Sequence, residues 1–74
     1  MYAPMTTLVE LSSDSELLGQ YDRLDVASVA ARQLIRAAGV PVTVRVYDVT
    51  DTAKALTRKF RMLRDLEGGV IVST

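Results

Sequence analysis

The sequence predicts an α/β fold, a small β-α-β-α-β two-layer sandwich in which two helices cover a three-stranded, largely parallel sheet. Three observations predict it: two segments with apolar residues at helical spacing, one segment of strict alternation between them, and short β-branched runs at both ends. Alternating strands and helices favour parallel strands joined by crossovers. We expect residues 1–74 to form one domain, with residues 1–5 as a flexible tail.

The first ordered segment is expected at Thr6–Leu11, where β-branched and aliphatic residues favour a short strand. The stretch Ser12–Tyr21 then mixes turn-forming residues with the apolar pair Leu17 and Leu18. We interpret it as a loop with a functional role, because large apolar side chains on a loop are costly unless a partner covers them.

An amphipathic helix is expected between Asp22 and Gly39. Asp22 suits the N-cap, Gly39 suits a left-handed C-cap, and Pro41 prevents continuation of the helix. Its apolar residues recur every three or four positions and therefore form one stripe, Leu24, Ala27, Ala31, Leu34, Ile35 and Ala38.

A strand is expected over Val40–Val49, because the residues alternate in polarity. Val42, Val44 and Val46 fall on one face, whereas Thr43, Arg45 and Tyr47 fall on the other. This pattern is typical of a strand that is covered on one side only.

A second helix is expected from Asp51 to the Gly68-Gly69 pair, followed by a third strand over Val70–Thr74. In this helix the inward residues are Ala53, Leu56, Phe60 and Leu63, and the outward residues are Lys54, Arg58 and Arg61. If the strands lie in sequence order, both helices cover one face of the sheet and leave the other open.

The composition excludes several classes of function. The chain has no Cys, His or Trp, which removes thiol chemistry, Cys/His zinc sites and histidine proton transfer. Nine basic and nine acidic residues cancel, so no net field drives binding to nucleic acid or anionic lipid. No apolar run is long enough for a membrane span. We therefore expect a cytoplasmic, non-enzymatic protein without a cofactor or metal.

A further pattern joins Ala31, Leu34, Gly39 and Val40, the run Val46–Asp51, and Val70–Val72. Through these residues, part of the chain resembles a truncated glutaredoxin-like, thioredoxin-type fold. That family has a Cys-x-x-Cys site after the first strand and a cis-proline before the third, whereas this chain has Ser12–Ser15 and Gly68-Gly69 there. The resemblance therefore implies a related fold without oxidoreductase activity.

The function that follows is a protein-binding module, a regulator or inhibitor of the kind that viruses also encode, acting through its loop, its open sheet face or a strand edge. A short chain without disulfides or metal is also expected to self-associate as a homodimer or larger homo-oligomer. The residues expected to contact the partner are Leu17, Leu18, Tyr21, Arg45 and Tyr47. Local packing is the alternative explanation for each of them.

Two other hypotheses about function are alternatives to protein binding. Lys54, Arg58 and Arg61 would bind the phosphate backbone of nucleic acid if they form one helix face, although a solvated face is the ordinary role of such a stripe. Asp48 and Asp51 would hold magnesium at the end of the middle strand, whereas the structural alternative is that Thr50 or Asp51 caps the second helix.

Overall fold

A computed structural model describes residues 6–73 of the chain. The expected tail, residues 1–5, and Thr74, the last residue of the expected third strand, lie outside the described residues. The elements follow the order β1 (Thr6–Ser13), β2 (Glu16–Tyr21), α1 (Leu24–Ala38), β3 (Val42–Val49), β4 (Lys54–Arg64) and β5 (Val70–Ser73).

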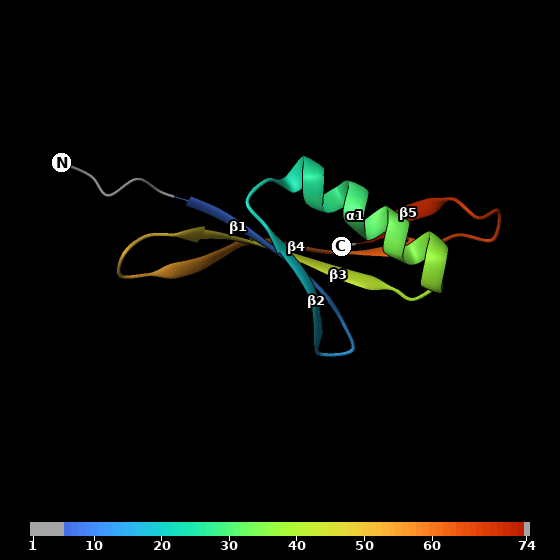
Figure 1. Ribbon diagram of the computed structural model, residues 1–74, viewed down its shortest axis with the longest axis horizontal. Coiled ribbons are helices and arrows are strands. Elements are labelled where there is room, and N and C mark those ends of the chain that lie inside the picture. Colours follow the sequence, from blue (N-terminus) through green and yellow to red (C-terminus); the bar gives the residue numbers. More distant parts are fainter. Residues whose placement is uncertain (1–5, 74) are drawn as a thin grey trace.

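The five strands form one open sheet in the order β2-β1-β3-β4-β5, and all neighbouring pairs are antiparallel. The helix α1 lies across one face (Figure 1). The predicted three-stranded, largely parallel sheet with two helices is therefore wrong, and so is the expectation of a thioredoxin-like fold. One β-hairpin takes the place of the expected loop Ser12–Tyr21, and another takes the place of the expected second helix. A hairpin joins antiparallel strands only.

The segment Ser12–Tyr21 is a β-hairpin and not the expected loop. Asp14 and Ser15 form its turn with φ angles of 49° and 72°, and two positive angles are typical of a type I′ hairpin turn. Leu11 and Ser12 continue β1 before the turn, and Leu17 lies opposite Ser12 after it. The prediction failed because neither turn residue is glycine, the usual signal for positive φ.

The expected first helix is confirmed as α1. Ala27, Ala31 and Ile35 are buried against the sheet, and Leu24 and Leu34 pack beside them. Gly39 ends the helix in the left-handed conformation at φ 69°, and its N–H donates to the Ile35 carbonyl at 2.8 Å.

The start of α1 differs from the prediction, because the N-cap is Arg23 and not Asp22. The Arg23 side chain pairs with Asp25 at 2.8 Å, and no side-chain hydrogen bond caps the helix. Asp25, in the first turn, is therefore the acidic residue whose negative charge interacts favourably with the positive end of the helix dipole.

The strand expected at Val40–Val49 is confirmed as β3, starting at Val42. Val42, Val44 and Val46 are buried beneath α1, so the predicted inward face is also confirmed. The core further contains Val9 and Leu11 from β1 and Phe60 and Met62 from β4. Small alanines on α1 allow the helix to lie close to this layer.

The expected second helix is wrong, since residues Lys54–Arg64 form strand β4. In this segment Phe60 and Met62, which are two positions apart, are both buried in the core, as expected for a strand, whereas Leu56 is exposed. Thr50 closes the β3–β4 turn: its N–H donates to the Ala53 carbonyl at 2.8 Å, and its Oγ1 accepts from the Ala53 N–H at 3.1 Å. Hairpin pairing with β3 therefore overrides the helical spacing, and neither Thr50 nor Asp51 caps a helix here.

The final strand is confirmed as β5, but it returns antiparallel to β4. Asp65 organises the turn between them, because its Oδ1 accepts from the Glu67 and Gly69 N–H groups at 2.9 and 2.7 Å. Gly68 adopts φ 84°, a left-handed angle that glycine tolerates.

The molecule is elongated, with extents of 50 × 22 × 19 Å. Helix α1 covers one half of the sheet, while the β3–β4 turn projects away from it at the opposite end (Figure 1). We call the projecting residues Tyr47–Lys59 the hairpin arm. None of them is fully buried, so both faces of the arm contact solvent.

Candidate functional site

The sheet face opposite α1 is open and carries an ordered set of polar and aromatic residues. Strand register places Leu8, Tyr47 and Leu56 in one row across β1, β3 and β4. The adjacent row consists of Glu10, Arg45 and Lys59. Arg45 and Tyr47 were both expected on this open face, and the structure places them there.

Side-chain contacts organise this face. Lys54 Nζ lies 3.3 Å from Glu10 Oε1 and 4.2 Å from the centre of the Tyr47 ring, so the lysine crosses Tyr47 to reach the carboxylate. Arg45 Nη1 donates to Ser12 Oγ at 2.8 Å. Because Lys54 covers one side of the Tyr47 ring, this tyrosine already has a partner within the chain.

Strand β4 concentrates positive charge. It contains five of the nine basic residues of the chain and no acidic residue between Lys54 and Arg64. Lys59 lies directly opposite Arg45 on β3. Like charges in directly opposed positions destabilise a sheet, and Glu10, which lies opposite Arg45 on β1, offsets part of this repulsion.

The basic set predicted for phosphate binding does not form one face. Lys54 and Arg61 belong to the open face by register, because they lie opposite Val49 and Thr43. Arg58 lies opposite the buried Val46, and its guanidinium stacks 5.1 Å from the centre of the Phe60 ring on the α1 side. The stripe required a helical period that β4 does not have.

The edge of β4 is mostly unpaired. β5 pairs only with Arg61–Arg64, so within residues 6–73 the edge Lys54–Phe60 has no strand neighbour on that side. We call this segment the basic edge, after Lys54, Arg58 and Lys59. A free edge presents backbone N–H and C=O groups that can pair with another strand.

Sequence reasoning did not find the basic edge, because it treated these residues as a helix. The alternation of Phe60 and Met62 with Lys59 and Arg61 was the available signal for a strand.

The other expected contact residues lie on β2. Leu18 and Tyr21 pack against the core, whereas Leu17 is 55% exposed on the open face beside Ser12. Strand β1 separates β2 from β3, so Leu17 does not pair directly with Arg45 or Tyr47, although Arg45 reaches Ser12, the residue opposite Leu17. Their role in partner binding stays a prediction.

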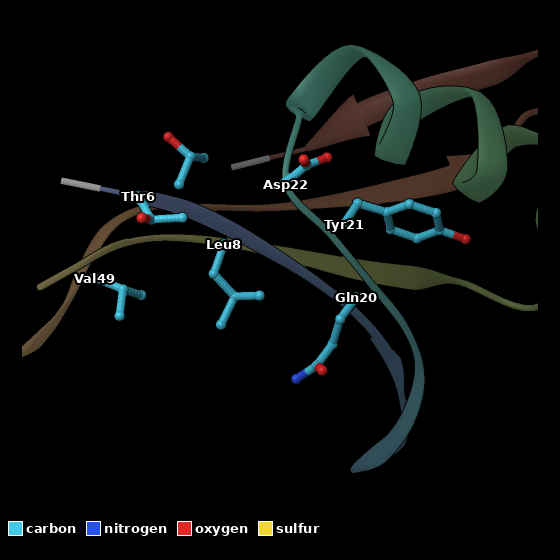
Figure 2. Close-up of a pocket in the computed structure, with 7 residues that line it drawn as sticks. Thr6, Leu8, Gln20, Tyr21, Asp22 and Val49 are labelled. Carbon is cyan, nitrogen blue, oxygen red and sulfur yellow. The ribbon is translucent and has the colours of Figure 1, made fainter. Parts of the chain in front are cut away.

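A shallow pocket of about 490 Å³ lies where β1 begins and β2 ends. It forms because β1–β2 pairing reaches only Val9 and Tyr21, which leaves Thr6–Leu8 uncovered on that side. Figure 2 shows Leu8 and Val49 pointing to one side of the sheet and Asp22 to the other. The pocket is lined by Thr6, Thr7, Leu8, Gln20, Tyr21, Asp22 and Val49, among which Asp22 is the one carboxylate.

The two carboxylates suggested to hold magnesium lie in different elements, β3 and the turn that follows it. Asp48 lies opposite Thr7 within the sheet, and Asp51 is exposed in the β3–β4 turn. Among residues 6–73 no group of three or more His, Cys, Asp or Glu side chains is placed to hold a metal ion.

Comparison with known proteins found no matching family model, no similar curated protein and no similar solved structure. In the part of the chain that the structure describes, no helix has the length and apolar character required to cross a membrane.

Proposed function

We propose that the protein is a non-enzymatic protein-binding module that takes an extended, acidic segment of its partner as an additional strand along the basic edge. The observation that carries this proposal is the free edge Lys54–Phe60, which has no strand neighbour within the described residues and contains three cations. Strand addition is a general mode of peptide recognition in which backbone pairing supplies affinity and side chains supply specificity.

The side chains of the basic edge favour an acidic segment. An added strand places its side chains alternately on the two faces of the sheet. On the open face they would lie beside Lys54, Leu56 and Lys59, and on the other face beside Arg58 and Phe60. A segment that alternates acidic and apolar residues would place its acidic side chains beside Lys54 and Lys59 on the open face and its apolar side chains beside Phe60 on the other face.

Binding of a partner peptide tests the proposal directly. The probe is a synthetic peptide of alternating Glu and Val, and the matched control peptide has Lys in place of Glu; fluorescence anisotropy measures both affinities. We expect the acidic peptide to bind and the basic peptide not to bind. Equal affinity for the two peptides, or no binding of either, would overturn the proposal.

Charge removal locates the binding edge. The variant K54Q/K59Q, which removes both cations of the basic edge from the open face, should weaken the acidic peptide by about 3- to 10-fold, since each exposed charge pair contributes roughly 0.2–1 kcal/mol. The control R32Q/R36Q removes the same charge from exposed positions on α1 and should leave the affinity unchanged. An equal loss in both variants would mean that overall charge, and not the basic edge, attracts the peptide.

A second candidate is phosphate-backbone binding, and one observation favours it. Arg45, Lys59 and Arg61 lie on the same open face, with Arg45 directly opposite Lys59. Single-stranded oligonucleotide binding that falls steeply with salt, with a slope of about −0.7 for each phosphate contacted, would support this function over peptide binding. The Lys54 side chain above Tyr47 argues against it, because a stacked base would have to displace that lysine.

A further inference from the structure

The two edges of the sheet carry opposite charge. The basic edge of β4 contrasts with β2, the strand at the other end of the sheet order. β2 contains Glu16 and no basic residue, and the exposed Asp14 and Asp22 lie just before and after it. We call Asp14–Asp22 the acidic edge.

The directions of the strands allow the two edges to pair. β2 runs antiparallel to β1, and the antiparallel pairs β1–β3 and β3–β4 give β1 and β4 the same direction. β2 therefore runs antiparallel to β4, as β5 does beside Arg61–Arg64. If a second copy extends the sheet in the same orientation, its β2 reaches the basic edge in the direction that β5 already uses.

Apolar contacts support the same arrangement. Leu17 on β2 and Leu56 on β4 are 55% and 51% exposed, and strand register places both on the open face. In a continuous sheet these two leucines would come from neighbouring strands and would shield each other from water.

From these observations we infer that the acidic strand recognised by the basic edge is β2 of a second copy of this chain, so that the protein self-associates head to tail. This inference rests on the proposed strand addition and names its occupant. A symmetric dimer through two β4 edges would place Lys54, Arg58 and Lys59 of each copy beside the same cations of the other, a repulsive arrangement. Head-to-tail contacts use two different surfaces, so they produce rings or open chains.

Sedimentation velocity tests self-association. We expect the average mass to rise at least twofold between low concentration and about 1 mM, a range that detects weak association. We also expect it to fall in about 0.5 M salt, where charges more than a few ångströms apart are screened. A monomer under all these conditions would overturn the inference, whereas the proposed function would stand if the acidic peptide still binds.

Reversal of charge distinguishes specific pairing from general attraction. The variants E16K/D22K and R58E/K59E each give a chain with two edges of the same sign, so each alone should remain monomeric. A mixture of the two should associate, because the basic β2 of one matches the acidic β4 of the other. The control R32E/R36E should associate like the unaltered chain, and a mixture that stays monomeric would contradict head-to-tail pairing.

Disulfide trapping gives an independent readout, because the chain has no cysteine of its own. In the variant L17C/L56C the two positions lie three strands apart, which alone separates them by at least about 14 Å, too far for a bond within one chain. Oxidation should therefore yield covalent oligomers on a non-reducing gel. The control L17C/L66C moves one cysteine to the fully exposed turn before β5 and should yield none; equal crosslinking of both variants would indicate random collision.

Discussion

The half of the sheet beneath α1 and the hairpin arm share strands β3 and β4 but are stabilised differently. Under the helix, Val42 and Val44 of β3 and Met62 of β4 are buried, so the removal of apolar surface from water holds this half together. In the arm every residue contacts solvent. Its side-chain contacts include the Thr50 turn, the hydrogen bond from Thr57 Oγ1 to the Val46 carbonyl where the β3–β4 register shifts, and the contacts of Lys54 with Glu10 and the Tyr47 ring.

The residues that stabilise the fold and the residues proposed to bind a partner therefore lie in different regions of the molecule. Regions with few buried contacts open at lower free energy than the core, and binding segments are drawn from such regions. The arm carries most of the basic edge, so a partner strand can add there without disturbing the packing beneath α1.

The largest expected contrast comes from the same substitution in the two regions. Leu11→Ala removes a side chain that is fully buried, and it should lower the free energy of unfolding by about 2–5 kcal/mol. Leu56→Ala in the exposed arm should change it by no more than about 0.5 kcal/mol. Urea denaturation measures both, and a similar loss in the two variants would show that the arm is part of the core.

A smaller effect is expected at the end of α1. Gly39→Ala places a Cβ on a residue at φ 69°, which should cost about 1–2 kcal/mol in thermal or urea unfolding. Gly39→Asn should cost less, because asparagine tolerates the left-handed conformation better. Equal costs for the two variants would mean that the conformation of Gly39 is not the reason for its presence.

The turn of the arm should show a local effect of about 0.5–1.5 kcal/mol. Thr50→Ala removes the hydroxyl that accepts from the Ala53 N–H, and amide hydrogen exchange should accelerate in the arm while the amides beneath α1 stay protected. Thr52→Ala, in the same exposed turn, is the control. Acceleration of exchange throughout the sheet would show that the two regions unfold together.

The smallest effect is expected for the ion pair of the arm. A double-mutant cycle with Lys54→Met and Glu10→Gln should give a coupling energy of about 0.2–1 kcal/mol, because the lysine is half exposed. The coupling should shrink as salt is added. A coupling energy that does not fall with salt would contradict a solvent-screened ion pair between Lys54 and Glu10.

Local patterns predicted α1, β3 and the final strand, because the apolar residues of each segment fit only one type of secondary structure. The apolar residues of the β4 segment fit two types. Leu56, Phe60 and Leu63 match a helix, whereas Phe60 and Met62 match a strand. The pattern could not choose between these two types, because pairing with β3 lies outside the segment.

The candidate site was predicted in part. Alternation within β3 was sufficient to place Arg45 and Tyr47 on the open face, and this face is open as expected. The basic edge depends on how far β5 extends along β4, and the acidic edge depends on β2 being the last strand of the sheet. Neither can be read from a single segment.

By itself, the amino-acid sequence determined the amphipathic helix ending at Gly39, the half-covered strand β3, and the absence of cysteine and histidine chemistry. Only the tertiary structure decided that β4 is a strand, that the sheet is antiparallel, and that its two edges differ in charge. The physical reason is the distance along the chain over which each interaction acts. Helical periodicity and capping act within a few residues, whereas strand pairing joins residues far apart in the chain and outweighs local preference.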